Sequence, residues 1–425
     1  MTRTNRRGFL AAISTSALAV GAGCTAPSAG RSAGQSDEGT HPVADPVSEW
    51  PSFRGGRYNT GYAKGVEGPG SEPSVAWRVE ADGPFWGSPI VAEDTVYVGS
   101  TDQSVYALDA ESGETRWTFD TEHRIEGAPA YDEGTVYIGS YDRHLYALDA
   151  ATGEERWSRD LGGLIRGSPT VREGTVILGV GCYNLACSWY AEDADVPENG
   201  WVYALDVASG ETVWRHDVGD EVVSTPAVDN GTVYVGASDA TLYALEIGSG
   251  GVEWTYDAED MIWSSPALAF GTVFFADWNG LVHAVDAASG DSEWTADTVG
   301  NYVSGSVAVD EEAVYVGHTP YNTLDDPLTH HGEVFKFDRE TGAERWSFET
   351  AALEVGSSPA VTDDRLYVGT HGQTERDDLG VYAISTDGTE EWFLEVGGRG
   401  VGSSPALADG TLYFGGTDGR MYAVE

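Results

Sequence analysis

The chain has few basic residues, and lysine is almost absent from it. Its 425 residues include 69 Asp and Glu but only 23 Lys and Arg, which gives a formal net charge of −46, and its lysines are Lys64 and Lys336. A protein that binds nucleic acid neutralises phosphates with clustered Lys and Arg. No segment of this sequence offers such a cluster, so we expect no nucleic-acid partner.

The acidic residues are not confined to a tail but occur in every segment. A large net charge makes a compact chain repel itself. At about 1 M salt the screening length falls to roughly 3 Å, which removes most of that repulsion. The composition is typical of proteins adapted to very high salt, as in haloarchaea. An acidic surface that attracts a basic partner is the alternative.

Long hydrophobic runs are missing except near the N-terminus. Residues 10–23 are apolar, but this run is shorter and richer in glycine than the roughly 20 apolar residues of a membrane span. It follows Arg6 and Arg7 in the string Asn-Arg-Arg-Gly-Phe-Leu, which resembles a twin-arginine export signal. It ends in Gly-Ala-Gly-Cys, which resembles a lipoprotein processing box with Gly21 where Leu is usual. We expect residues 1–24 to be a signal peptide and Cys24 to carry a lipid; an ordinary cleaved signal is the alternative.

Residues 25–48 contain mostly Ser, Gly, Ala, Pro and acids, a composition that cannot bury a core. We expect this segment to be a flexible tether and residues 49–425 to form the folded part. The expected mature protein is therefore exported by the twin-arginine route and held at the outer face of the cell membrane by its lipid alone.

Cysteine is also scarce. Apart from Cys24 the chain has only Cys182 and Cys187. Outside the cell a pair this close in sequence favours a disulfide that staples a loop. A redox or metal site is the alternative.

Internal repetition dominates the rest of the sequence. One unit runs from Ser88-Pro89 through Thr-Val-Tyr-Val-Gly and Val-Tyr-Ala-Leu-Asp to Trp117, and the next repeats this order 40 positions later at Trp157. Segments rich in β-branched and aromatic residues, separated by turn residues, predict four short strands in each unit. Such units cannot bury both faces alone, so radial packing around a channel is favoured.

The number of repeats follows from the tryptophan that ends each fourth strand. The last repeat stops at Glu425 without a fourth strand, and the segment around Trp77 is a fourth strand with nothing before it. We therefore expect the N-terminal strand to complete the last unit, which removes two exposed edges. The result is an all-β, eight-bladed β-propeller of four-stranded antiparallel blades. The repeat tryptophans are Trp77, Trp117, Trp157, Trp214, Trp254, Trp294, Trp346 and Trp392.

The residues around each of these tryptophans resemble the tryptophan-docking motif of PQQ-type (pyrroloquinoline quinone repeat) propellers. The first copy consists of Ala107, Asp109, Ser112, Gly113 and Trp117. Glycine permits the turn, and the Asp and Ser side chains bond its backbone. The small Ala is expected to leave room for a neighbouring indole, whose N–H needs a buried partner. The string Trp-Pro-Ser-Phe-Arg-Gly at 50–55 also resembles the segment that precedes the ring in this family.

The resemblance implies one of two kinds of protein. The first kind is the quinoprotein alcohol dehydrogenases, which bind PQQ and Ca²⁺ above the channel. The second kind is BamB, a lipid-anchored scaffold of the outer-membrane assembly machine, with its relatives. The dehydrogenases carry a vicinal Cys-Cys pair that this sequence lacks, and their Ca²⁺-binding Glu and Asn and catalytic Asp match no position. We therefore expect no cofactor, with PQQ and calcium as the alternative.

The functional face is expected where loops are inserted, because loops on a rigid scaffold usually carry function. Residues 181–200, 318–333 and 370–380 all lengthen the connection between the second and third strands. The residue two before each Ser-Pro should ring the channel mouth on that face. We expect a ligand to contact Trp86, Glu126, Arg166, Trp263 and Ser304; the ring is completed by Val223, Gly356 and Gly402. Alternatively, Trp86 and Trp263 plug the channel and Glu126 pairs with Arg166.

Histidines occur in two of the insertions, near two aspartates. Imidazole and carboxylate ligands bind transition metals, but the spacing fits no known motif, so we expect solvated loops and no metal site. These residues are His318, His330, His331, His371, Asp325 and Asp326. Zinc-protease, nucleophile-elbow and phosphate-loop patterns do not occur in the sequence.

Taken together, these patterns favour a monomeric, non-catalytic binding scaffold over an enzyme. Its partner, a protein or a small ligand, is expected on the insertion-bearing face, and only the lipid contacts the membrane. A PQQ-dependent dehydrogenase is the main alternative. An enzyme of another class, or a carrier of sugar or metal, that uses the same face is a further one.

Overall fold

The computed structural model describes residues 49–181, 199–298, 302–320, 331–352, 354–372 and 379–425. The expected signal peptide, tether and lipidation site lie outside these residues. So do Cys182, Cys187, His330, Asp325 and Asp326. No helix within the described ranges is long and apolar enough to cross a membrane.

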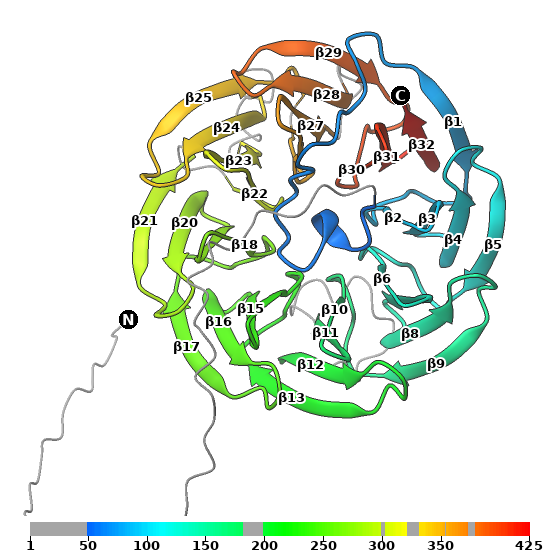
Figure 1. The fold of residues 1–425 in the computed structure, drawn as a ribbon, viewed down its shortest axis with the longest axis vertical. Helices are drawn as coiled ribbons and strands as arrows, with labels where there is room; N and C mark the ends of the chain where they lie inside the picture. The colour runs from blue at the N-terminus through cyan, green and yellow to red at the C-terminus, as the bar shows by residue number, and fades with distance from the viewer. Residues whose placement is uncertain (1–48, 182–198, 299–301, 321–330, 353, 373–378) are drawn as a thin grey trace, which may run out of the picture. The chain divides into compact units, whose positions relative to one another are not determined.

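Eight four-stranded antiparallel sheets stand around a central axis in these ranges, as the sequence predicts (Figure 1). Each sheet is one blade, and its first strand lies nearest the axis. The strands of the first four blades are β2 (Ile90–Ala92), β3 (Thr95–Gly99), β4 (Ser104–Asp109) and β5 (Thr115–Asp120); β6 (Ala130–Asp132), β7 (Thr135–Gly139), β8 (His144–Asp149) and β9 (Glu155–Asp160); β10 (Thr170–Arg172), β11 (Thr175–Val180), β12 (Gly200–Asp206) and β13 (Thr212–Val218); and β14 (Ala227–Asp229), β15 (Thr232–Gly236), β16 (Thr241–Glu246) and β17 (Val252–Asp257).

The other four blades continue the same order. Their strands are β18 (Ala267–Ala269), β19 (Thr272–Ala276), β20 (Leu281–Asp286) and β21 (Ser292–Asp297); β22 (Ala308–Val309), β23 (Ala313–His318), β24 (Glu333–Asp338) and β25 (Glu344–Glu349); β26 (Ala360–Val361), β27 (Arg365–Gly369), β28 (Gly380–Ser385) and β29 (Glu390–Glu395); and β30 (Ala406–Ala408), β31 (Thr411–Gly415), β32 (Arg420–Val424) and β1 (Val75–Glu80).

Burial along each blade follows from its strand composition. The second strand, such as β3 with Thr-Val-Tyr-Val-Gly, is buried along its whole length, because both of its faces pack against neighbouring blades. The fourth strand, such as β5, alternates exposed polar residues with the buried Trp117. The core therefore lies between blades, as a series of apolar clusters around the ring.

The N-terminal strand completes the last blade, which confirms the predicted closure. In β1, Trp77 pairs with Ala423 of β32. Beyond the strand, Ser74 and Glu425 exchange two backbone hydrogen bonds of 2.8 and 3.0 Å. The two ends of the folded part thus lie in one sheet, with no unpaired edge between them.

Each docking tryptophan ties its blade to the next one. The indole N–H of Trp117, for example, donates a 2.9 Å bond to the carbonyl of Ala150 in the following blade. The indole lies against Gly153, where an added Cβ would come 2.7 Å from the ring. The space for the indole is therefore left by this glycine of the next blade's turn, a role that the sequence analysis gave to the alanine. Trp392 is the exception, because its buried indole N–H has no hydrogen-bond partner among the described residues.

The segment before β1 lies across the axis, where Figure 1 shows it in dark blue with the 3-10 turn η1 (Phe53–Gly55). Its backbone bonds to the first strands of six blades. The carbonyls of Trp50 and Pro51 accept from Val91 and Tyr131, and those of Arg57, Tyr58, Thr60 and Gly61 accept from Val228, Leu268, Val309 and Val361. We call residues 49–65 the axial segment. It closes the end of the channel at which the first strands finish.

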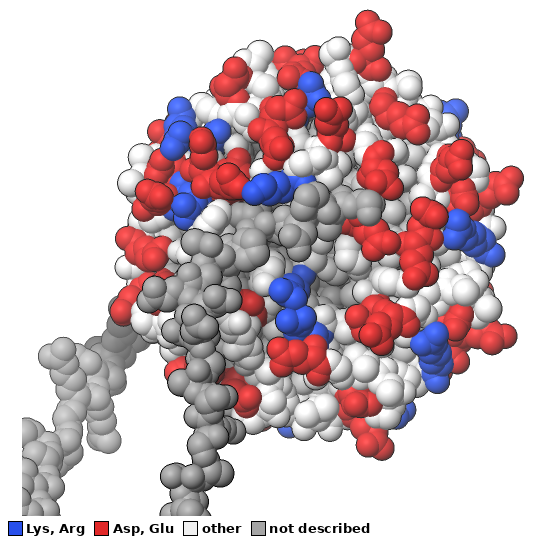
Figure 2. All heavy atoms as spheres, viewed as in Figure 1, with Lys and Arg blue, Asp and Glu red and all other residues white. Residues whose placement is uncertain are grey.

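Acidic side chains are spread in separate patches over the face drawn in Figure 2, with fewer basic ones among them. Several ion pairs are local to one blade, such as Arg116 with Asp109 at 2.8 Å and Arg156 with Asp149 at 2.8 Å. In both pairs the side chains are exposed, so each contributes little to stability.

Candidate functional site

The eight predicted rim residues lie around one pocket at the channel mouth. Its empty volume, including the part open to solvent, is about 550 Å³. The insertion-bearing connections begin on the same face. Tyr302 and Glu354, each two residues before a rim residue, form β-bridges with residues at the start of two of these connections, Thr319 and His371. The axial segment closes the opposite end, and its Phe53 lines the pocket from below. The pocket therefore opens toward the insertions only.

One side of the mouth carries a cluster of paired charges. Arg166 bonds both carboxylate oxygens of Glu221, at 3.2 and 3.3 Å, and Glu221 is 1% exposed. Glu126 accepts a hydrogen bond from Tyr141 and pairs with Arg124 at 3.3 Å. Burial alone would lower the pKa of Arg166, but the neighbouring Tyr141, Glu221 and Glu126 outweigh it and raise that pKa. The ion pair of Arg166 is thus with Glu221, a residue that the sequence analysis did not single out.

The other side of the mouth is aromatic. Trp263 meets Trp278 edge-on with ring centroids 4.4 Å apart, and Trp278 stacks on Tyr302 at 4.8 Å. The indole N–H of Trp263 bonds Ser238 at 3.0 Å, and the guanidinium of Arg166 lies over its ring. Trp263 is therefore fixed by its neighbours on several sides.

Trp86 is placed differently from Trp263. It is 38% exposed, and it meets His371 edge-on with centroids 5.6 Å apart. A side chain this exposed does not fill the channel, whose far end is closed by the axial segment instead. Trp86 offers an apolar surface at the mouth, where aromatic side chains commonly contact ligands.

Two of the insertion histidines are uncharged at neutral pH. Burial lowers the pKa of His318 and that of His371 to about 4. His371 contacts the carboxylate of Glu354 at 3.1 Å, and burial raises the pKa of Glu354. Within the described ranges, no three His, Cys, Asp or Glu side chains are grouped so that they could hold a metal ion.

A ring of hydroxyl groups lies below the mouth. In seven of the eight blades, a Ser or Thr stands directly before the Pro or Val that leads into the first strand. Its side-chain oxygen accepts a hydrogen bond of 2.8–3.3 Å from the backbone N–H of the equivalent residue in the preceding blade. In the remaining blade this position is Ala128. All eight residues line the pocket, and the hydroxyl ring consists of Ser88, Ser168, Thr225, Ser265, Ser306, Ser358 and Ser404.

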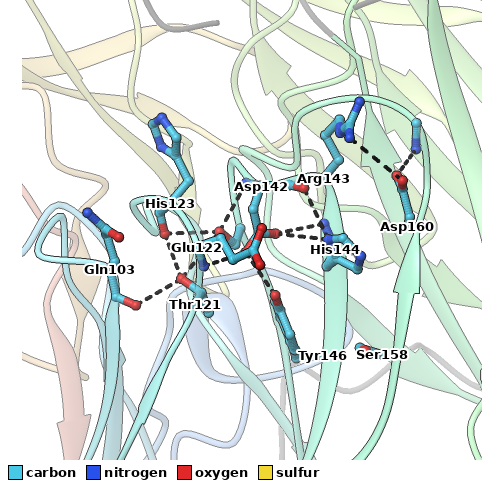
Figure 3. A network of polar contacts seen from close by, with 12 residues as sticks. Gln103, Thr121, Glu122, His123, Asp142, Arg143, His144, Tyr146, Ser158 and Asp160 are labelled. Carbon is cyan, nitrogen blue, oxygen red and sulfur yellow. Dashed lines mark hydrogen bonds and ion pairs between the residues drawn. The ribbon is translucent and has the colours of Figure 1, made fainter. Parts of the chain in front are cut away.

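Aspartates in the short connections between second and third strands hold this face together. Figure 3 shows one of them, Asp142, which accepts the backbone N–H of His144 and of Glu122, at 2.9 Å each, and the hydroxyl of Tyr146 at 2.8 Å. Glu122 belongs to the segment that enters from the preceding blade, so the carboxylate links two blades. Equivalent aspartates are Asp102, Asp239 and Asp418. In a further blade Asp277 lies two positions earlier in the connection and accepts the N–H of Leu281. The other three blades carry the insertions at this position.

The fold and pocket define the chain as an eight-bladed propeller with one closed and one open channel end. The family model described as "Outer membrane protein assembly factor BamB" matches residues 70–126, 101–185, 198–324 and 278–425. The chain therefore belongs to this family, which confirms the predicted resemblance. A search of curated proteins found no significant match.

Solved structures share the fold. BamB from Moraxella catarrhalis is 20% identical, with a TM-score of 0.65 over 83% of this chain and 98% of that one. The quinohemoprotein alcohol dehydrogenase ADHIIG from Pseudomonas putida HK5 is 16% identical, with a TM-score of 0.73 over 89% and 80%. The quinohemoprotein alcohol dehydrogenase from Comamonas testosteroni is 18% identical, with a TM-score of 0.72 over 90% and 81%. At these identities the likeness establishes the fold alone.

Proposed function

We propose that the protein is an exported, lipid-anchored scaffold that binds a protein partner or a small ligand through its insertion-bearing face. The observation that carries this proposal is the pocket, which gathers all eight predicted rim residues and opens only on that face. Membership of the BamB family supports a scaffold. The charged groups at the mouth also support it, because the carboxylates of Glu126 and Glu221 are each held in an ion pair with an arginine and so are not free to act as a general base.

The scaffold function is tested by recovering the full chain from its own cells and measuring its mass under native conditions. A bound small molecule adds a defined mass, which should be present in the native protein and absent from the Trp86→Ala variant. Val213→Ala, at an exposed outer-strand position, should retain it. An adduct that survives Trp86→Ala would contradict the proposed site. If no mass is added in either protein, a small ligand is ruled out and the protein partner becomes the remaining case.

Export and anchoring are proposed from the sequence of residues 1–24. Cells that express the chain should place it in the membrane fraction, and Cys24→Ala should release it into the soluble exported fraction. Replacing Arg6 and Arg7 by Lys should retain the chain in the cytoplasm. A Cys24→Ala variant that stays with the membrane would contradict the lipid anchor.

A quinone-dependent dehydrogenase is the second candidate, because two enzymes of that kind share the fold at TM-scores above 0.7. The pocket does not fit the calcium and quinone that such enzymes need. Calcium takes roughly six to eight oxygen ligands, whereas the carboxylates of Glu126 and Glu221 are committed to arginines. Calorimetric titration of the protein with PQQ and Ca²⁺ in molar KCl should show no binding. Saturable binding near one to one would overturn the scaffold and favour alcohol oxidation.

A further inference from the structure

The hydroxyl ring has donors that no protein group uses. Each of its seven oxygens accepts a backbone N–H from the preceding blade. Within the described part of the chain none of these hydroxyls donates a hydrogen bond to a protein acceptor. Six of the seven ring residues are buried, with Ser358 at 3% exposed, and Ser404 is partly exposed. All seven line the pocket. Seven O–H donors therefore surround the space above the channel floor.

A serine next to the ring shows that this arrangement is specific to the ring. Ser264 is adjacent to the ring residue Ser265, and its hydroxyl donates to the carbonyl of Ala276 at 2.6 Å and accepts the N–H of the same residue at 2.8 Å. Ser357 and Ser403 bond their own blades in the same way, to Gly369 and Gly415. The first hydroxyl of each pair is thus satisfied inside its blade, and only the second, on a residue that lines the pocket, has no protein acceptor among the described residues.

A buried positive charge lies beneath the ring. Arg54 of the axial segment is 3% exposed. Its guanidinium donates to the carbonyls of Asn59, Thr60 and Val307, at 3.0, 3.4 and 2.7 Å, and pairs with no carboxylate among the described residues. Val307 directly follows Ser306 of the hydroxyl ring. Burial lowers the pKa of Arg54 to about 9, so the group is still protonated at neutral pH.

A positive charge lies below the floor of the pocket: Arg54 does not itself line the pocket, but it directly follows the lining residue Phe53 in the axial segment. At the mouth Arg124 pairs with Glu126 and Arg166 with Glu221, so those four charges cancel. The charge of Arg54 below them remains. A site that combines unpaired O–H donors with an uncompensated buried cation favours a negatively charged ligand, even in a chain whose total charge is strongly negative.

From this geometry we infer that the floor of the pocket is a binding site for a small anion, either a free halide or the carboxylate of a larger ligand that enters from the mouth. The anion accepts O–H bonds from the hydroxyl ring and lies in the field of Arg54. The inference deepens the proposed function, since the site is the floor of the same pocket. It assigns a chemical class to what the pocket takes.

The native chain offers matched variants for the test. Removing two ring hydroxyls in Ser265→Ala with Ser358→Ala should weaken anion binding about tenfold for each hydroxyl, which corresponds to about 1.4 kcal/mol each. Ser264→Ala with Ser357→Ala removes two satisfied neighbours and should leave anion binding unchanged. Ala128→Ser adds the eighth hydroxyl and should strengthen binding, with no cavity or lost contact that could confuse the result.

The direct measurement is anomalous scattering from crystals of the protein soaked in bromide. One axial bromide peak is expected between the hydroxyl ring and Phe53, stronger in Ala128→Ser and reduced in Ser265→Ala/Ser358→Ala. The absence of that peak in the native protein, or an equal peak in the ring-depleted variant, would overturn the inference. Because no organic ligand or partner is present, failure here leaves the scaffold proposal standing.

The two sources of the anion are separated in solution. In chloride-35 nuclear magnetic resonance, the native protein should broaden the chloride line. If a carboxylate binds at the same floor, added acetate should reduce this broadening. Broadening that acetate leaves unchanged would identify the site as one for free halide. No excess broadening relative to Ser265→Ala/Ser358→Ala would contradict both.

Discussion

The guanidinium of Arg54 donates a 2.7 Å hydrogen bond to the carbonyl of Val307, a residue 253 positions later in the chain. Nearby, the Asn59 amide donates to the carbonyls of Thr225 and Pro266 at 3.0 and 3.2 Å. These bonds close the ring at its axis, while the pairing of β1 with β32 closes it at the periphery. The axial segment and the strand β1 that follows it thus hold the propeller closed at two places, the axis and the periphery.

Arg54→Ala should destabilise the protein strongly. The substitution leaves three buried carbonyls without this donor, and each buried unsatisfied group costs about 1–3 kcal/mol, so we expect a loss of about 3 kcal/mol or more. Urea unfolding at fixed KCl measures it. Arg57→Ala is the control, because the side chain of Arg57 hydrogen-bonds its neighbour Tyr58 and no buried carbonyl among the described residues. Equal losses for the two variants would contradict the closing role of Arg54.

Two tryptophans with equal burial should respond differently to substitution by phenylalanine. Trp214 and Trp392 are each 7% exposed. The indole N–H of Trp214 donates a 2.6 Å bond to the carbonyl of Ile247, whereas that of Trp392 has no partner in the described part of the chain. Trp214→Phe should therefore cost about 1–2 kcal/mol more than Trp392→Phe. Thermal unfolding of both variants checks this difference, and a larger loss for Trp392→Phe would refute the docking account.

Stability should fall as the pH drops from about 6.5 to about 4. Burial lowers the pKa of His318 to about 4 in the folded protein, so between these values the unfolded chain binds a proton that the folded chain does not. The stabilisation is complete above pH 6.5 and decreases by up to about 3 kcal/mol as the pH reaches 4. His318→Gln should reduce the slope of the stability profile in this window, and His371, whose pKa is also lowered to about 4, accounts for the slope that remains. An unchanged profile would show that His318 titrates normally.

The melting temperature should rise steeply with KCl. At 0.1 M salt the screening length is about 10 Å, and at 1 M it is about 3 Å, so the repulsion that arises from a net charge of −46 weakens over this range. KCl is preferred to a sulfate salt, because sulfate also strengthens apolar burial. Equal melting temperatures at 0.1 and 2 M KCl would contradict the expected adaptation to high salt.

The sequence predicts nearly all of the fold because the same pattern of strand and turn residues occurs in each of the eight repeats. Strand β3 has the predicted bounds of Thr95–Gly99, and the turn at Asn230 and Gly231 takes positive φ angles of 48° and 85°, as a two-residue hairpin requires. The rim positions were found for the same reason, since a fixed offset from Ser-Pro places them on one ring.

What the sequence left open depends on contacts that no repeat encodes. The string around Arg54 resembles a segment of the family, but its place on the axis follows from backbone bonds to six blades. The partner of Arg166 is Glu221, which lies in the same connection as the rim residue Val223, two positions before it. The hydroxyl ring had a visible signal, namely the Ser or Thr at the same offset in seven repeats and Ala128 in the eighth.

The most direct test of the scaffold account is photo-cross-linking from the pocket rim in living cells. A photoreactive amino acid at Ser304, on the rim, should form a defined adduct, and the same group at the exposed Glu114 in the turn between β4 and β5 should not. Excess wild-type protein should reduce the adduct, because it competes for the same partner or ligand. Excess Trp86→Ala protein should not reduce it, provided that its melting temperature equals that of the wild type. Equal competition by both proteins, or equal adducts from both positions, would contradict the pocket as the binding site.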